Sequence, residues 1–178
     1  MPNQPHFHIA LIEPEIPNNT GSIGRTCVGT HCKLHLVGRL GFDISDRAVK
    51  RAGLDYWENL DLDVHQNYES MMEQVADPKR VFYFTKKASK TLYEVKFQPG
   101  DWLVFGKETT GLDEKLLREV ESQTVRIPLL GPVRSLNLSN AVSIATYEAL
   151  RQTVLLNYSN SSISMKHLGY NGDFDKTL

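Results

Sequence analysis

The stretch LVFGKETTGL, residues 103–112, decides the fold of this chain. Its apolar start belongs to a segment, 102–105, that is dense in aromatic and β-branched residues and predicts a buried strand. Two glycines follow, with Glu108 between them, and glycine permits close backbone approaches that a side chain would block. The stretch is therefore either a tight connection from a strand to a helix or part of a binding site.

Apolar bursts alternate with longer amphipathic stretches along the rest of the chain. Strands are expected at 7–12, 34–37, 60–64, 81–85, 102–105 and 124–127, and helices at 21–31, 46–52, 68–75, 112–120 and 139–156. Strands separated by helices imply βαβ units, so we expect an α/β fold with a mainly parallel sheet. No long linker divides the chain, which predicts one domain over residues 1–156 and a polar C-terminal tail over 157–178.

The composition is that of an ordinary globular protein. The 178 residues include 20 Lys+Arg and 21 Asp+Glu, a net charge of −1, which excludes global electrostatic capture of nucleic acid but not a local basic patch. No apolar run is long enough to span a membrane, and we see no secretory signal. Two cysteines do not make a disulfide framework in a chain of this size. We expect a cytoplasmic protein with reduced thiols and no membrane association.

Familiar nucleotide and metal motifs do not match. Gly100 and Gly106 have five residues between them, whereas a P-loop requires four, and the glycines after the first strand lack the spacing of a dinucleotide fingerprint. His31, Cys32 and His35 lie close together, but no second cluster with ligand spacing completes a coordination shell. We therefore expect neither a common nucleotide-binding fingerprint nor a metal site.

Two further polar segments accompany the opening stretch. EPEIPNNTGSIGR, residues 13–25, follows the first expected strand, and its Pro17 precedes an Asn/Thr cluster suited to capping a helix. Arg25 lies one helical turn beyond Gly21. IPLLGPVRSLNLSNA, residues 127–141, leads into the longest helix, whose orphan N–H groups its Ser and Asn side chains can cap. A capped surface helix with a solvated arginine is the simpler interpretation of the first segment.

Together these segments resemble the SPOUT superfamily of RNA methyltransferases, most closely the minimal tRNA ribose methyltransferases that act on the wobble nucleotide. The resemblance covers residues 7–156. The matching motif residues are Asn19, Gly21 and Arg25 in the first segment, Gly106, Glu108 and Gly111 in the second, and Ser135, Asn137, Ser139 and Ala141 in the third. The segment RAGLDY, residues 51–56, also looks like the wobble-methylating subgroup.

The resemblance implies helices on both faces of the sheet and a C-terminal trefoil knot that binds S-adenosyl-L-methionine, with S-adenosyl-L-homocysteine as the product. The cofactor-binding residues that it implies are Phe84, Gly106, Glu108, Ile127, Leu130, Ser135, Leu136 and Asn140. Leu130 and Leu136 would be apolar walls. For Phe84, Ile127 and Leu136, plain core packing is the alternative interpretation.

The implied reaction is in-line methyl transfer to the ribose 2′-oxygen of tRNA nucleotide 34, a cytidine or modified uridine, in a leucine tRNA. The positive sulfur activates the methyl group, so no metal is required. Arg25 and Asn19 are the expected catalytic residues. A guanidinium with a pKa above about 12 is a poor base, so we expect Arg25 to hold a phosphate or the ribose oxygen and stabilise negative charge. The alternatives are another tRNA or rRNA ribose as substrate, or a non-catalytic RNA-binding module.

Basic residues are expected to grip the tRNA. The candidates are Arg47, Lys50, Arg51, Lys86, Lys87 and Arg134, several of which cluster at helical spacing or among aromatic residues. The long helix carries Ala141, Ala145 and Ala149 at every fourth position and is apolar around much of its circumference, so it needs cover on more than one side. A second copy of the chain is the expected cover, since members of the family are homodimers. Tyr147 is an interface, site or core residue.

Overall fold

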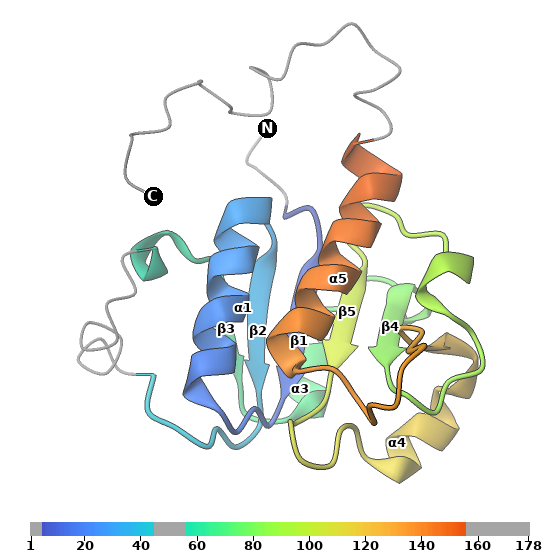
Figure 1. Cartoon of the computed structure of the whole chain (residues 1–178). Helices are drawn as coiled ribbons and strands as arrows, with labels where there is room; N and C mark the ends of the chain where they lie inside the picture. Colours follow the sequence, from blue (N-terminus) through green and yellow to red (C-terminus); the bar gives the residue numbers. More distant parts are fainter. Residues whose placement is uncertain (1–4, 45–55, 156–178) are drawn as a thin grey trace, which may run out of the picture.

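The computed structural model describes residues 5–44 and 56–155 (Figure 1). Six parallel strands form one sheet in the order β3-β2-β1-β5-β4-β6. The strands are β1 (His8–Ile12), β2 (Lys33–Val37), β3 (Leu62–His65), β4 (Val81–Phe84), β5 (Trp102–Phe105) and β6 (Thr124–Val125). The predicted α/β class, the parallel sheet and all six expected strands are confirmed.

The helices match the expected ones within the described residues. They are α1 (Pro17–Thr30), α3 (Tyr68–Met72), α4 (Glu114–Glu119) and α5 (Leu138–Leu150), which continues as one π-helical turn, Arg151–Leu155. Short 3₁₀ turns are η1 (Trp57–Asn59), η2 (Pro78–Arg80), η3 (Leu92–Glu94) and η4 (Glu121–Gln123). The helix expected at 46–52 and the tail at 157–178 lie outside the described residues, and the knot stays a prediction.

Helix α1 begins at Pro17, four residues before the expected start at Gly21. Proline suits the first helical position because its fixed φ matches the helix and its missing N–H would have no partner there. Ile16 precedes it and makes no side-chain cap. The carboxylate of Glu108, from a distant segment, accepts from the N–H of Ile16 instead. Pro17 is thus a local signal for the observed start, whereas the cap supplied by Glu108 has no signal in the neighbouring sequence.

Helices cover both faces of the sheet, as expected. Figure 1 shows α1 and α5 side by side on one face, where Ile23 of α1 and Val142 of α5 join the larger core cluster. On the other face, Met71 of α3 and Leu117 of α4 pack against Val104 of β5 and its neighbours. The chain therefore leaves β1 toward one face and leaves β5 toward the other. Such a divergence between adjacent parallel strands opens a crevice at their carboxyl ends, where ligands bind in open α/β sheets.

A row of three histidines, of which His35 and His65 are buried and His8 is partly buried, crosses the α3/α4 face. His8 Nδ1 lies 2.9 Å from His35 Nε2, and His35 Nδ1 lies 2.9 Å from His65 Nε2. The rings of His8 and His35 also pack on Trp102, with centroids 4.3 Å apart in each pair. Burial, followed by repulsion from Lys33, lowers the pKa of His8 to about 4, and burial together with the neighbouring histidines lowers that of His35 to about 3. The row is therefore neutral at physiological pH.

Helix α5 has a small-residue side and an apolar exposed side. Ala145 and Ala149 are buried, which confirms that the alanine ridge packs closely. Ser143 Oγ lies 3.1 Å from Thr26 Oγ1 and joins α5 to α1. Tyr147 is not a core residue, because 56% of it is exposed, and Ile144 is 39% exposed. Among the described residues, none of the helices has the length and apolar character needed to cross a membrane.

Candidate active site

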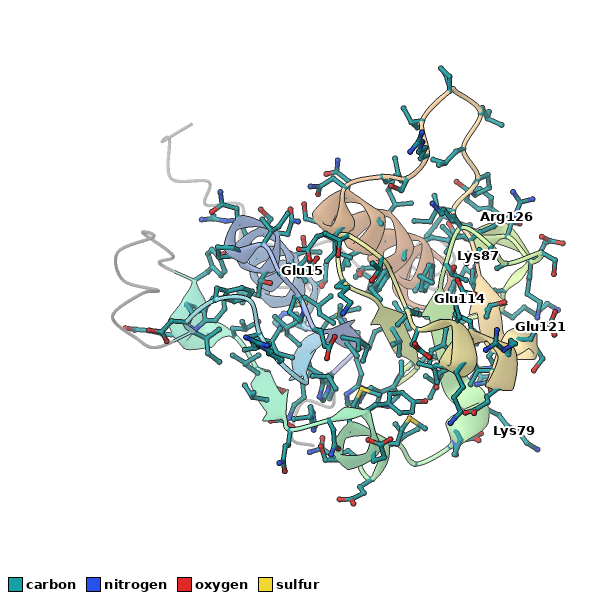
Figure 2. The ribbon with its side chains drawn as sticks, turned by 90° about the horizontal axis from the view of Figure 1, so that it is seen from below. Glu15, Lys79, Lys87, Glu114, Glu121 and Arg126 are labelled. Carbon is teal, nitrogen blue, oxygen red and sulfur yellow. The ribbon has the colours of Figure 1, made fainter. Side chains whose placement is uncertain are left out.

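A cavity of about 450 Å³ lies at the carboxyl ends of β4 and β5, beside the start of α1. All three polar segments singled out in the sequence contribute to its lining. The expected site residues that line it are Asn19, Phe84, Gly106, Glu108, Ile127, Ser135 and Leu136. Figure 2, viewed from below Figure 1, looks onto this edge of the molecule. The cavity therefore joins distant segments of the chain, and two of its lining residues, Asn19 and Asn137, form a hydrogen bond although they are 118 positions apart.

The turn after β5 folds back on itself so tightly that it needs glycine. A Cβ on Gly106 would lie 2.1 Å from the carbonyl carbon of Gly111 and 2.2 Å from the amide nitrogen of Leu112. Gly111 has a φ of 75°, in the left-handed region, and its N–H donates to the Lys107 carbonyl at 2.9 Å. The two glycines that the sequence places on either side of Glu108 are thus the two ends of a closed backbone turn.

Glu108 ties this turn to the start of α1. Its carboxylate accepts from the backbone N–H of Glu15 at 2.8 Å and of Ile16 at 3.2 Å, and from Asn19 Nδ2 at 2.9 Å. Burial alone would raise the pKa of Glu108, but these hydrogen bonds hold it below its usual value. Glu108 is therefore an ionised bridge between two loops, and its carboxylate oxygens accept hydrogen bonds from N–H groups of the protein itself.

Two further side chains reinforce the same bridge. Thr109 Oγ1 donates to the Glu15 carboxylate at 2.8 Å and the Thr109 N–H donates to it at 3.1 Å. Lys107 Nζ lies 2.7 Å from Glu13 Oε2. Glu15 is labelled in Figure 2, where it lies between α1 and the β5–α4 turn. The β1–α1 and β5–α4 connections are consequently fastened at several points along their length.

Asn137 joins the third segment to the other two. Its Nδ2 donates to Asn19 Oδ1 at 2.9 Å, while its Oδ1 accepts from the N–H of Ser139 at 2.9 Å and caps α5. Asn19 is 7% exposed and lies between Glu108 and Asn137, with its amide hydrogen-bonded on both sides. The amide side chain of Asn19 is thus oriented by its neighbours rather than free to rotate.

Apolar side chains form the rest of the wall. Phe84 stacks on Phe105 with centroids 4.5 Å apart, and Ile127 and Leu136 line the same cavity. Leu130 is fully exposed and does not line the cavity, whereas its neighbour Leu129 does. The Leu129-Leu130 pair gave no sequence signal to distinguish the inward side chain from the outward one.

Other placements also differ from the expected set. Asn140 is exposed in the first turn of α5 and does not line the cavity. Thr85, Thr110 and Leu112 line it and were not singled out. The only sequence signal that could have found these three residues is their position, since each lies within a residue or two of an expected site residue or strand end. The sequence predicted the segments of this cavity better than its individual side chains.

Arg25 lines a different cavity, of about 590 Å³, on another side of α1. The guanidinium carbon lies 4.4 Å from the centroid of the Tyr56 ring, a cation–π arrangement. Phe42, Trp57 and Tyr147 contribute further aromatic side chains to this cavity. The structure thus brings Asn19 to the first cavity and Arg25 to the second, although both belong to one motif on one helix.

The expected RNA-binding residues fall into two groups. Lys86 and Lys87 line the first cavity, and Lys87 forms an ion pair with Glu114, as the labelled side chains in Figure 2 show. Arg134 is exposed in the loop before α5. Arg47, Lys50 and Arg51 lie outside the described residues. Lys86 and Lys87 therefore border the cavity, whereas Arg134 lies next to its lining residue Ser135 in the chain.

One group of potential metal ligands occurs within the described part of the chain. It comprises His35, Asp63 and His65, whose ligand atoms lie within 4.8 Å of one another on the α3/α4 face. These atoms already have protein partners, since His35 and His65 share a contact and Asp63 Oδ2 lies 3.1 Å from Lys33 Nζ. The group shares no residue with either cavity.

A parallel sheet with a turn-lined cavity at its switch point is the arrangement in which open α/β proteins bind their ligands. Residues 6–147 match the SpoU rRNA Methylase family, and the chain belongs to this family.

Individual relatives agree with that assignment. The chain is 45% identical over 148 residues to a tRNA (cytidine(34)-2′-O)-methyltransferase from Burkholderia pseudomallei, which covers 82% of this chain and 95% of the relative. A structure solved for insight into the 2-OH methylation of C/U34 on tRNA is 44% identical, with a TM-score of 0.78 over 84% of this chain and 97% of that one. The SpoU methyltransferase AviRb from Streptomyces viridochromogenes, in complex with AdoMet, is 26% identical, with a TM-score of 0.68 over 85% of this chain and 59% of that one.

Proposed function

We propose that this chain transfers a methyl group from S-adenosyl-L-methionine to the ribose 2′-OH of tRNA nucleotide 34, a cytidine or modified uridine. The observation that carries the proposal is the convergence of three motif segments on one cavity at the switch point of the sheet. The near full-length likeness to enzymes named for this reaction supports it. A leucine tRNA is the substrate that we expect, and the cytoplasm is the expected location.

The first cavity suits the cofactor on its own geometry. Its volume of about 450 Å³ falls in the range of roughly 300–1,000 Å³ that small-molecule sites occupy. Phe84, Ile127 and Leu136 offer apolar surface for the faces of a purine, and the closed turn that begins at Gly106 offers backbone polar groups for its edge. S-adenosyl-L-methionine supplies a methyl group that its positive sulfur activates. The donor set of this cavity calls for no metal.

The protein residues would position the ribose and stabilise charge. Arg25 would hold a phosphate or the 2′-oxygen, because a guanidinium offers a fixed fork of N–H donors to developing negative charge. Asn19 would present its amide to the reacting region, and Glu108 and Asn137 would fix that amide in one orientation. Most of the rate enhancement would come from holding the hydroxyl oxygen in line with the methyl group.

The homodimer is part of the proposal, and the two cavities give it a chemical role. Arg25 does not line the cofactor cavity of its own protomer, although the proposed reaction would use both. The exposed Ile144 and Tyr147 on α5 are suitable for burial against a second copy. If partners share sites, mixing Arg25→Ala and Gly106→Ala chains should restore part of the activity that each lacks. Two inactive parents and an equally inactive mixture would contradict the shared site.

Lys86, Lys87 and Arg134 would contact the tRNA backbone beside the cavity. Each phosphate contact releases counterions, so binding should weaken steeply as salt rises. A salt-independent affinity would argue against this basic surface.

Mass spectrometry of tRNA nucleosides after incubation with methyl-labelled donor tests the function. Label in the 2′-O-methyl nucleoside at position 34 is the expected result. Label at another ribose would instead support the related tRNA or rRNA methylation, and no label with folded protein that still binds tRNA would support a non-catalytic module.

A further inference from the structure

Tyr56 lies against the helix that carries Arg25, at a place where the chain packs unusually closely. We propose that Tyr56 is a positioning residue that fixes the guanidinium of Arg25 for methyl transfer. The catalytic importance of Arg25 rests on the proposed function, whereas the contact between the two side chains does not.

The hydroxyl group anchors the ring. Tyr56 is 9% exposed, and its O–H donates to the carbonyl of Gly21, one helical turn before Arg25. The ring centroid lies 4.4 Å from the guanidinium carbon. The same side chain therefore contacts α1 at two successive turns, once through its hydroxyl and once through its face. A ring held at its far end in this way is a fixed platform rather than a mobile neighbour.

Gly24 allows the ring to come this close. A Cβ on Gly24 would lie 3.3 Å from Trp57 Cζ3 and 3.5 Å from Tyr56 Cε2. It would also lie 3.3 Å from Leu60 Cδ2, so the segment around η1 is seated directly on the helix backbone. Glycine is less favourable than alanine in a helix interior, and at this position it leaves room for the aromatic pair to pack on the helix backbone.

A stacked ring suits the task that Arg25 would perform. Arginine has a long flexible side chain, and holding it in one geometry costs rotamer entropy. A contact between the guanidinium carbon and the face of an aromatic ring restrains the group through its face rather than through a hydrogen bond. Tyr56 itself does not line the cofactor cavity, so its effect on the reaction would pass through Arg25.

The sequence could only hint at this role. Tyr56 ends the segment RAGLDY, which had no assigned chemistry, and it lies 31 positions beyond Arg25. Its partner residues Gly21 and Gly24 sit in the first motif. The structure links the two segments and explains why a glycine stands at position 24, directly before the arginine.

The test compares variants of the full chain. Tyr56→Leu removes the ring and should lower kcat about two- to fivefold, the scale of a cation–π contact to an exposed guanidinium, with cofactor affinity unchanged. Tyr56→Met, with an unbranched side chain that fills irregular gaps, serves if the leucine variant does not fold. Tyr56→Phe keeps the ring but loses the hydroxyl anchor and should retain most of the activity. Tyr68→Phe, which removes a hydroxyl contact to Tyr83 on the opposite face, is the matched control and should match the wild type.

A double-mutant cycle shows whether Tyr56 acts through Arg25. In an Arg25→Lys background with residual turnover, Tyr56→Leu should cost clearly less than in the wild type, because residues that act as a unit are not additive. An equal loss in both backgrounds, or wild-type turnover in both the Leu and Met variants, would overturn the proposal.

A second measurement needs no activity. The Arg25 Nε–Hε resonance should be displaced by the ring current of Tyr56, should stay displaced in Tyr56→Phe and should move toward its ordinary position in Tyr56→Leu or Tyr56→Met. A resonance that does not respond would refute the contact in solution even if the enzyme is active. If the resonance responds but no tRNA is methylated, the contact stands and the proposed function fails.

Discussion

The two cavities beside α1 are built in different ways. The cofactor cavity is bounded by backbone turns and apolar side chains, and hydrogen bonds from Glu108 and Asn137 fix those turns to one another. The Arg25 cavity is bounded by aromatic side chains and by the polar face of α1. The path of the backbone defines the cofactor cavity, whereas the side chains that cover α1 define the Arg25 cavity.

The difference suggests a division of labour. A cavity made of closed turns can hold a ligand of constant shape, because the backbone approaches it closely and does not rearrange. A cavity made of aromatic rings and an arginine suits part of a nucleic acid, since rings stack on bases and guanidinium groups pair with phosphates. Changes in the first should therefore affect cofactor binding, and changes in the second should affect turnover.

The largest effect is expected from Arg25→Ala. Loss of a group that stabilises developing charge should lower turnover about 100- to 1,000-fold. Cofactor affinity, measured by equilibrium dialysis, should stay within twofold of the wild type, because Arg25 does not line that cavity. Near-normal turnover would remove Arg25 from the mechanism and with it the functional contrast between the cavities.

Gly106→Ala should have the next largest effect, and on the other cavity. The new Cβ would lie 2.1 Å from the backbone of Gly111, so the closed turn must open. Overpacking of this kind costs about 1–3 kcal/mol, and we expect a loss of cofactor affinity of about 10- to 100-fold in equilibrium dialysis.

The matched control is Gly131→Ala, because no atom lies within 4 Å of a Cβ built there. It should bind the cofactor as the wild type does. Equal affinities for the Gly106 variant and this control would show that the turn does not shape the cavity.

Glu108→Gln should weaken the bridge between the two connections. Glutamine offers one acceptor oxygen where the carboxylate receives three N–H groups, so at least one donor loses its partner. We expect the free energy of unfolding to fall by about 1–2 kcal/mol in urea titrations at pH 7.

The pH dependence of this effect has a defined sign. The pKa of Glu108 is lowered by its hydrogen bonds, so its contribution is present above the pKa of an unfolded glutamate and is lost as the pH falls through the folded value. The wild type and the variant should therefore converge in stability in acid. A difference that is constant down to pH 3 would contradict an ionised bridge.

Acid should lower the stability of the sheet. Its effect on the two cavities should be the smallest of those predicted here. His8 and His35 have pKa values near 4 and 3 in the folded protein, so only the unfolded chain takes up protons as the pH falls below about 6.5. Between pH 6.5 and 5.5 each should cost about 1 kcal/mol of stability. Proton NMR should show neither ring titrating above pH 5, and a midpoint near 6.5 for either would contradict the buried row.

Local pattern was enough to predict the sheet. The apolar segment 102–105 matches its strand to the residue, and the other five expected strands lie within about two residues of the observed ones, because burial on both faces of a parallel sheet requires continuous apolar runs. Helix ends were less accurate. Helix α1 begins at Pro17, which suits a first helical position, but the N–H of Ile16 is paired by a carboxylate 92 residues away, and no local rule contains such a partner.

The sequence predicted which segments form the candidate site. It did not predict that their residues are divided between two cavities. The resemblance placed Asn19 and Arg25 together in one catalytic motif, but six residues along a helix rotate the two side chains to different sides. Asn19 faces the cofactor cavity and Arg25 faces the aromatic one. The histidine row was missed for a related reason: its members come from three strands, and sheet order, rather than sequence distance, brings them together.

Titration calorimetry with S-adenosyl-L-homocysteine tests the central claim most directly. Our account predicts measurable heat and one saturable site per chain in the folded wild type, and a curve of the same affinity for Arg25→Ala. A flat titration with folded wild-type protein would show that the glycine and serine turns do not form a cofactor cradle.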